Sequence, residues 1–129
     1  MTSLPALAGL AVLVVEDDYY LADDTLRTLQ AAGARVAGPY ARVAESLSRL
    51  AGDRIDCGVL DVNLGEGPSF ATARALKQRR VPFIFLTGYG REALPEDFDD
   101  VELLEKPVDS RALIDAVARA CAKASLTGI

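Results

Sequence analysis

Three short apolar runs without polar alternation occur along the chain, and each ends at a polar side chain. The runs and their end residues are 10–15 with Glu16 and Asp17, 57–60 with Asp61, and 83–86 with Thr87. Apolar runs of this length predict strands that are covered on both faces, as in a parallel sheet between two layers of helices. We therefore expect three central strands that carry polar residues at their carboxyl ends.

Two other segments mix charged and apolar residues, which is typical of strands at the edge of a sheet. They are residues 34–38, which contain Arg35, and residues 101–104, which contain Glu102. Pro39 is expected to end the first of them, because proline cannot donate to a sheet ladder. Five strands with long connections predict a parallel, doubly wound α/β sheet with the strand order 2-1-3-4-5.

Apolar residues that repeat at i, i+4 and i+7 predict amphipathic helices between the strands. The expected helices cover about residues 20–32, 43–52, 70–80 and 110–124. Ser69 and Asp109 are the expected N-caps of the last two helices. Residues 88–100 lack the periodicity and contain glycines, a proline and clustered acids, so at most one short helical turn fits there. We expect the fourth helix of the fold to be short or poorly ordered.

Length and charge indicate one domain without a nucleic-acid surface or a membrane segment. For the 129 residues we expect an N-terminal tail at 1–9, the domain at 10–124 and a C-terminal tail at 125–129. The net charge of −5 gives no basic surface for nucleic acid. The apolar stretch 4–15 is too short for a bilayer and follows no Lys or Arg, so neither a signal peptide nor an anchor is expected.

The residue types that are rare or missing narrow the chemistry further. Cys57 and Cys121 have no spaced partner set, which favours reduced thiols packed as small apolar side chains in a cytoplasmic protein. The chain contains no histidine, so phosphohistidine chemistry and histidine acid–base catalysis on this chain are excluded.

The expected sheet places three carboxylates together. Its switch point lies between the first and third strands, so Glu16 and Asp17 should lie next to Asp61. Three carboxylates in one place repel one another, and a cation is therefore expected between them. Mg²⁺ is the natural candidate, because it takes oxygen ligands and commonly combines one or two carboxylates with a phosphate. Asp17 and Asp61 fit as direct ligands, and Glu16 as a direct or water-bridged one.

Thr87 and Lys106 follow the fourth and fifth strands and are expected at the same edge of the sheet. If a phosphoryl donor binds there, a carboxylate oxygen of Asp61 can attack phosphorus and form an aspartyl phosphate. Lys106 would supply a positive charge and Thr87 a hydroxyl donor for the phosphoryl oxygens. Each of these residues alone also fits a capping, turn or surface role, but their joint placement favours the phosphoryl site.

These positions resemble the response-regulator receiver domain of two-component systems, over residues 10 to 124. The resemblance implies a CheY-like, flavodoxin-like (βα)5 fold and a cytoplasmic phosphoprotein of phosphorelay signal transduction. It implies that Asp61 is the phosphoacceptor and that the backbone carbonyl of Asn63 joins the Mg²⁺ ligands. It also implies that Thr87 and Lys106 hold the phosphoryl group. Such a protein is not an enzyme beyond its own phosphorylation and dephosphorylation.

The same resemblance suggests the partners. The donor would be a phosphohistidine on a sensor histidine kinase or a histidine phosphotransfer protein. The stretch 85–90, Phe-Leu-Thr-Gly-Tyr-Gly, resembles the variant receivers named for a Phe-Ala-Thr-Gly motif, the "FAT GUY" group. Members of this group are typically stand-alone regulators served by HWE-type or related kinases, and we expect a stand-alone regulator here. The downstream target and homodimerisation stay open.

The switch of such a domain would be modified here. Leu103 stands where receivers commonly carry a switching aromatic residue, three positions before the lysine. Thr87 and Tyr89 are therefore the expected switch residues. Tyr89 either shields the phosphoryl group from water or packs in the groove left by Leu103.

Two alternatives of other classes remain. A pseudo-receiver would have the same fold but act as an interaction module that takes no phosphoryl group. A phosphatase-like hydrolase with Asp61 as nucleophile is disfavoured by the position of the Asp-x-Asn run on the third strand.

Overall fold

The computed structural model describes residues 5–64, 67–68, 70–88, 90–91 and 94–127. Five parallel strands form one sheet in the order β2-β1-β3-β6-β7. The strands are β1 (Ala11–Val15), β2 (Arg35–Tyr40), β3 (Cys57–Asp61), β6 (Phe83–Thr87) and β7 (Leu103–Glu105). Because β6 and β7 are the fourth and fifth strands of this sheet, the predicted order 2-1-3-4-5 and the doubly wound α/β class are confirmed.

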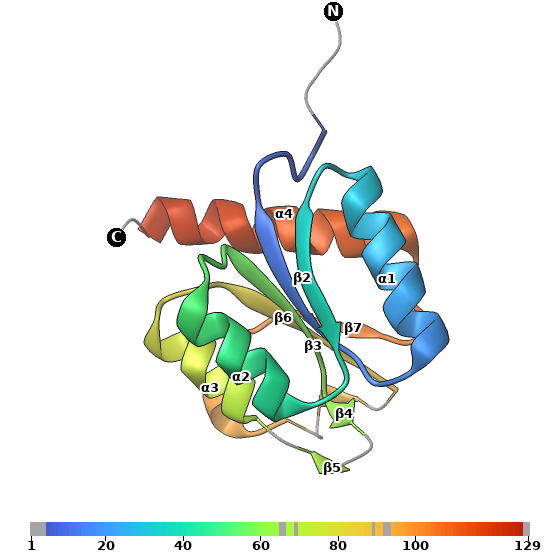
Figure 1. Cartoon of the computed structure of the whole chain (residues 1–129). Coiled ribbons are helices and arrows are strands. Elements are labelled where there is room, and N and C mark those ends of the chain that lie inside the picture. The colour runs from blue at the N-terminus through green and yellow to red at the C-terminus, as the bar shows by residue number, and fades with distance from the viewer. Residues whose placement is uncertain (1–4, 65–66, 69, 89, 92–93, 128–129) are drawn as a thin grey trace, which may run out of the picture.

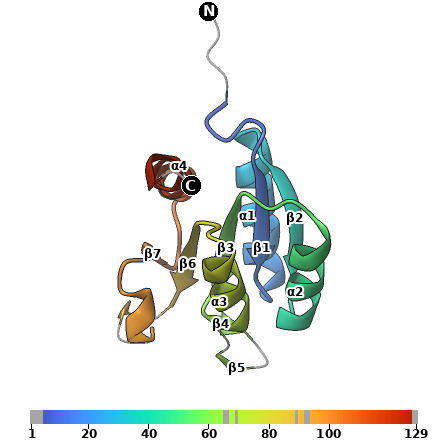
Figure 2. The same ribbon diagram turned by 90° about the vertical axis from the view of Figure 1, so that its left-hand side faces the viewer.

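In the part of the chain that the structure describes, four α-helices cover the two faces of the sheet. They are α1 (Tyr19–Ala31), α2 (Val43–Gly52), α3 (Ala71–Gln78) and α4 (Ser110–Thr127). The helices α2 and α3 lie in front of the sheet in Figure 1 and α4 lies behind it, where it contacts α1. The short strands β4 (Asn63–Leu64) and β5 (Gly67–Pro68) pair in antiparallel fashion. They lie beyond the carboxyl ends of the strands, at the bottom of Figures 1 and 2.

The core has two layers, because successive residues of a strand point to opposite faces of the sheet. Val12 and Val14 belong to the layer under α1 and α4, together with Leu29. Leu13 and Val15 belong to the layer under α2 and α3. All residues of β3 and β6 are buried, as the unbroken apolar runs predict.

The helix ends follow the local sequence. Asp109 Oδ2 accepts a hydrogen bond from the Ala112 N–H at 3.0 Å, so the predicted N-cap of the last helix is confirmed. Residue 110 begins this helix, which extends to Thr127, three residues past the expected end of the domain at 124. The helix α3 begins at Ala71, and its predicted cap, Ser69, lies outside the described residues.

The edge strands differ from the prediction in their bounds. The strand β2 continues through Pro39 to Tyr40, so the predicted end at Gly38 is wrong. Its register with β1 shifts between Leu13 and Val15, and this bulge accommodates a residue without an N–H. Gly38 has a φ of +102°, and a Cβ there would lie 2.8 Å from Val14 O, so the bulge also requires glycine.

The last strand of the sheet begins later than predicted. The strand β7 starts at Leu103 instead of 101, because the Val101 N–H donates to Phe98 O in the preceding turn. This turn follows η2 (Glu96–Phe98), a 3₁₀ helix within the segment where one short turn was expected. Phe98 is fully buried and packs edge-on against Phe83 and Phe85. The acid-rich segment therefore has an apolar anchor that its pattern does not indicate.

The expected N-terminal tail packs across the amino ends of the strands in its described part. Leu7 is fully buried, and its N–H donates to Ala32 O at 2.8 Å. This segment lies at the top of Figures 1 and 2, opposite β4 and β5.

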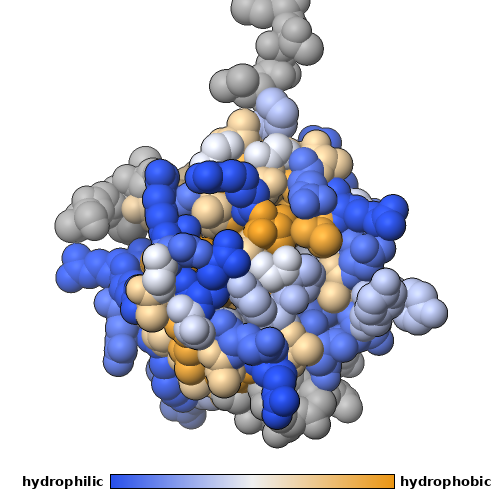
Figure 3. Space-filling view, in the orientation of Figure 1, coloured by the Kyte–Doolittle hydropathy of each residue, from blue (hydrophilic) through white to orange (hydrophobic). Residues whose placement is uncertain are grey.

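The visible surface is mainly hydrophilic in Figure 3, with apolar residues in small patches. Among the described helices, none has the length and apolar composition needed to span a bilayer.

Candidate functional site

Three carboxylates from two neighbouring strands meet at the carboxyl edge of the sheet. Glu16 and Asp17 directly follow β1, and Asp61 is the last residue of β3, which pairs with β1. One carboxylate oxygen from each of the three residues lies within 4.8 Å of the other two. Glu16 is 2% exposed and Asp61 4%, whereas Asp17 is open to solvent. The sheet order brings together the acids that the sequence pattern predicted at the switch point.

Lys106 joins the two buried carboxylates. Its Nζ lies 3.0 Å from Glu16 Oε1 and 3.1 Å from Asp61 Oδ1. The backbone N–H of Lys106 donates to Thr87 O at 2.8 Å, which fixes the start of the segment after β7. Burial lowers the pKa of Lys106, but its two carboxylate partners outweigh this effect and raise the pKa above its usual value. The ammonium group is therefore charged where it lies between the acids.

Glu16 holds its proton more strongly than an ordinary carboxyl group. Burial, and then the hydrogen bond and charge of Asp61, raise the pKa of Glu16 from 4.5 to about 7, against the opposing effect of Lys106. Glu16 Oε2 also accepts a hydrogen bond from the Asp18 N–H at 3.2 Å. Two acids in one site resist simultaneous ionisation. Additional positive charge at this edge would favour the fully ionised cluster.

The donor atoms of the cluster suit a hard divalent cation. They are all carboxylate oxygens, which Mg²⁺ prefers, and they come from residues of which two are buried and one is open to solvent. The cluster borders a hollow of about 370 Å³, lined by Glu16, Asp17, Asp18, Leu21, Asp61, Gly88 and Lys106. Glu16, Asp17 and Asp61 could therefore hold the ion while the hollow admits a further oxygen-bearing group.

The other predicted site residues are described to different extents. Thr87 ends β6, one position past the residue that pairs with Asp61, and its side chain is fully buried. Asn63 begins β4, two residues after Asp61, and its backbone pairs with Pro68. Tyr89 lies outside the described residues.

The start of α1 contributes residues that the sequence pattern did not assign to the site. Asp18 lines the hollow and is exposed at the start of α1, where its Oδ1 accepts hydrogen bonds from the N–H groups of Tyr20 and Leu21, both at 3.0 Å. An aspartate at an N-cap position is the signal that could have revealed this role. Tyr19 and Tyr20, which follow Asp18 in the sequence, are 78% and 82% exposed.

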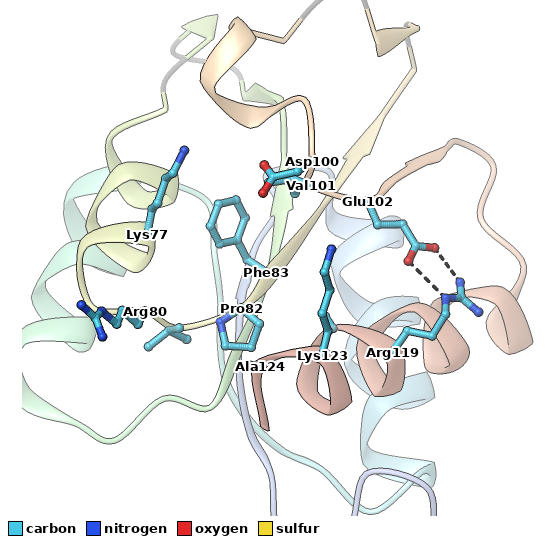
Figure 4. Close-up of a pocket in the computed structure, with 12 residues that line it drawn as sticks. Lys77, Arg80, Pro82, Phe83, Asp100, Val101, Glu102, Arg119, Lys123 and Ala124 are labelled. Atoms are coloured by element: carbon cyan, nitrogen blue, oxygen red, sulfur yellow. Dashed lines mark hydrogen bonds and ion pairs between the residues drawn. The ribbon is translucent and has the colours of Figure 1, made fainter. Parts of the chain in front are cut away.

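A larger cavity lies away from the acid cluster, at the amino ends of β6 and β7. Its volume is about 710 Å³, and Figure 4 shows Phe83 at its floor between side chains of α3 and α4. Arg119 and Glu102 form an ion pair at its rim, with Arg119 Nε 3.2 Å from Glu102 Oε1. The carboxylate cluster and Lys106 lie at the opposite end of the strands. The smaller hollow beside them is therefore the candidate functional site.

Comparison with protein families gives one match. The model described as the response regulator receiver domain matches residues 12–118. A search of curated proteins finds no match.

Solved structures with similar folds include receiver domains from several organisms. A response regulator receiver protein from Sinorhizobium medicae is 25% identical, with a TM-score of 0.77 over 89% of this chain and 96% of that one. The signal receiver domain of a modulated diguanylate cyclase from Desulfovibrio desulfuricans is 26% identical, with a TM-score of 0.80 over 91% and 97%. A CheY-like receiver domain protein from Methanospirillum hungatei is 22% identical, with a TM-score of 0.78 over 92% and 98%, and supports the fold alone.

Proposed function

Because the chain belongs to the response regulator receiver domain family, we propose that it accepts a phosphoryl group on Asp61 from a phosphohistidine of a partner protein. The partner would be a sensor histidine kinase, of the HWE type or a related one, or a histidine phosphotransfer protein. The likeness of residues 85–90 to the FAT GUY group supports a stand-alone regulator in the cytoplasm. Its phosphorylated form would act on a downstream protein.

The observation that best supports this proposal is the shared ammonium group. Lys106 lies within 3.1 Å of a carboxylate oxygen of both Glu16 and Asp61, at the edge where doubly wound sheets bind ligands. Buried carboxylates are costly to ionise, so their clustering around one lysine is difficult to explain as packing alone. A site that accepts a phosphoryl group would account for this arrangement of carboxylates around one lysine.

In the proposed reaction, a carboxylate oxygen of Asp61 attacks phosphorus while the P–N bond to the donor's imidazole breaks. The bonding electrons leave with the imidazole ring, and the new O–P bond leaves the aspartyl phosphate on β3. Lys106 would turn from the carboxylates toward a phosphoryl oxygen, and the Thr87 hydroxyl would donate to another. When bound by Glu16, Asp17, Asp61 and the Asn63 carbonyl, Mg²⁺ supplies positive charge for the remaining phosphoryl oxygens.

The signal would leave the site through the segment after β6. A phosphoryl group adds charge and acceptor oxygens next to Thr87, which ends that strand. We propose that Thr87 and Tyr89 form the switch. In this proposal Tyr89 also limits the access of water to phosphorus, so Tyr89→Ala would shorten the lifetime of the phosphorylated form.

An exchange of one side chain tests the proposed nucleophile. Asp61→Asn keeps the size of the side chain but removes the attacking carboxylate, so incubation with acetyl phosphate and Mg²⁺ should leave this variant unmodified on a phosphate-affinity gel. Asp23→Asn is the matched control, because Asp23 is an acid on α1 that pairs with Arg27. The parent and the control should both shift. A shift of Asp61→Asn equal to that of the parent would refute Asp61 as the nucleophile.

The gel-shift assay and a measurement of phosphate release distinguish the two alternative functions. A parent protein that stays unmodified both by acetyl phosphate and by the histidine kinases of its cell would be a pseudo-receiver. Repeated release of phosphate from a phosphomonoester would instead indicate a hydrolase, because a receiver is modified once per donor.

A further inference from the structure

A cavity of about 710 Å³ at the amino ends of β6 and β7 lies outside the proposed phosphoryl site. Its walls come from α3, from the turn before β7 and from the second half of α4, and Figure 4 shows Phe83 between them. Binding sites for small molecules are concave and commonly enclose about 300–1,000 Å³. The cavity therefore has the size of a site for a small organic molecule.

The crossover between β6 and β7 leaves apolar surface at the border of this cavity. A crossover between parallel strands usually carries a helix that covers the sheet. The described residues of this crossover form no α-helix, and the 3₁₀ helix η2 ends at Phe98. Val81, Pro82 and Val101 are only half-buried where they line the cavity. Apolar surface that the fold does not cover is available to a ligand.

The rim of the cavity has the opposite charge to the chain as a whole. Four of its side chains are cationic and two are acidic, namely Lys77, Arg80, Arg119 and Lys123 against Asp100 and Glu102, which gives an excess of two positive charges. Glu102 is paired with Arg119, so the excess rests on the other three cations. The chain as a whole carries a net charge of −5. The rim therefore attracts anions locally, although the net charge of the chain repels them.

Lys123 is the cation best placed to meet a ligand that lies on the apolar lining. Figure 4 shows its side chain extending from α4 into the cavity, toward the segment 100–102. Lys77 is already engaged, because its Nζ donates to Asp97 O. The flexible stem of a lysine lets its ammonium group follow the charged end of a ligand.

The size of the lining favours a small molecule over a protein partner. Twelve described residues line the cavity. A stable protein interface takes about 20–30 residues from each partner. The lining is thus too small for a typical protein interface but sufficient to enclose a small ligand.

We propose that this cavity binds a free amphiphilic carboxylate, such as a medium-chain fatty acid, with its carboxylate on Lys123 and its apolar chain against Phe83 and Val101. Binding removes the chain from water and covers apolar side chains that the crossover leaves half-buried. The carboxylate accepts a charge-assisted hydrogen bond from the ammonium group. The site goes beyond the proposed phosphoryl transfer, since Asp61 ends β3 at the opposite edge of the sheet.

Nuclear magnetic resonance on the full, unphosphorylated chain tests this site. Amide spectra are recorded during a titration with octanoate, kept below its micellar concentration. The proposal predicts saturable shifts confined to residues 80–83, 100–102 and 119–124, with unchanged amides at the acid cluster. An absence of saturable shifts, or shifts centred elsewhere, would overturn it. Shifts of the same amides on raising the protein concentration alone would assign the cavity to a second copy of the chain and overturn it as well.

Two analogues test the two halves of the ligand. Octanamide keeps the apolar chain but carries no charge, so it should bind about tenfold more weakly than octanoate, because one charge-assisted hydrogen bond is lost. Acetate keeps the carboxylate without the long chain and should cause no saturable shifts, because it buries little apolar surface. Equal affinities for octanoate and octanamide would overturn the role of the cationic rim.

A matched pair of charge reversals on α4 tests Lys123. Arg111 is an exposed residue of the same helix outside the lining, so Arg111→Glu changes the net charge as Lys123→Glu does. Lys123→Glu should weaken octanoate binding by at least about tenfold. Arg111→Glu should keep the affinity within about twofold, because salt screens a distant surface charge. Equal affinities of the two variants would overturn the proposal.

A variant that fills the cavity tests the apolar half of the site without a change of charge. Ala120 is half-buried on α4 and lines the cavity, so the larger side chain of Ala120→Leu competes with the ligand for space. This variant should also bind octanoate more weakly than the parent. An unchanged affinity would contradict the proposed placement of the apolar chain. Circular dichroism melts of all three variants confirm that they are folded before titration.

Discussion

Single side chains determine the electrostatics of the acid cluster, because Glu16 and Asp61 are both buried and share Lys106 as counter-ion. A buried carboxylate without a partner is strongly destabilising. Asp17 adds a third carboxylate at the open side of the cluster. In the absence of a metal ion, one ammonium group and the proton that Glu16 retains up to about neutral pH offset two of the three negative charges.

Replacement of the lysine tests this balance. Lys106→Met should lower the free energy of unfolding by about 3 kcal/mol in EDTA, because two buried acids lose their counter-ion. Urea titration at pH 8, above the raised pKa of Glu16, measures this loss. The control is Lys123→Met, an exposed position on α4, which should change stability by no more than about 0.5 kcal/mol. Equal stabilities of the two variants would show that the ion pairs of Lys106 do not support the fold.

The raised pKa of Glu16 predicts a pH dependence of stability. The folded-state pKa of about 7 lies above the ordinary 4.5, so Glu16 contributes stability that is complete below pH 4.5 and is lost as pH rises through 7. This contribution amounts to about 3 kcal/mol at most. In EDTA, Glu16→Gln should match the parent near pH 5 and gain stability relative to it by pH 8. Parallel stability curves for the two proteins would contradict the raised pKa.

At the scale of elements, uniform patterns predicted structure better than mixed ones. The apolar runs that became β1, β3 and β6 lie within one residue of their predicted bounds, because strands buried on both faces require such runs. The bounds of the edge strands β2 and β7 differ from the predicted ones. Pairing with β1 sets the end of β2, and the preceding turn sets the start of β7. These are contacts between segments distant in the sequence, which local patterns do not encode.

Phe98 provides a prediction at this scale, since it anchors the segment between β6 and β7. Phe98→Ala should reduce the free energy of unfolding by about 3–5 kcal/mol, because it leaves a cavity beside Phe83 and Phe85. Asp99→Ala, an exposed position directly after η2, should have little effect. Chemical denaturation of both variants decides the point. A small loss for Phe98→Ala would mean that this segment packs loosely on the sheet.

At the scale of the whole molecule, the order of the strands in the sheet determines where the site residues lie. A doubly wound sheet brings the ends of β1 and β3 together, so the residue types at those ends were sufficient to predict the acid cluster. The ion pairs of Lys106 could not be predicted in the same way. They depend on how the segment after β7 packs against the sheet, which only the assembled fold specifies.

Metal binding gives a prediction for the whole domain. Mg²⁺ that binds only the folded state should stabilise it, by about 2.7 kcal/mol at a concentration of 100 times Kd. The melting temperature of the parent should rise with added Mg²⁺, whereas that of Asp17→Asn should respond much less. Asp24→Asn, an exposed acid on α1 outside the cluster, is the matched control and should respond like the parent. Equal responses of all three proteins would exclude Asp17 as a ligand.

The central claim is that Asp61 is the residue that becomes phosphorylated. Its most direct test is chemical mapping: the protein is incubated with acetyl phosphate and Mg²⁺ and then treated with borohydride, which reduces an aspartyl phosphate to homoserine. Peptide mass spectrometry then locates the homoserine. The account predicts homoserine at position 61 and unmodified aspartate at positions 17 and 18. Homoserine at another acid, or its absence from every peptide of a fully covered chain, would contradict the account.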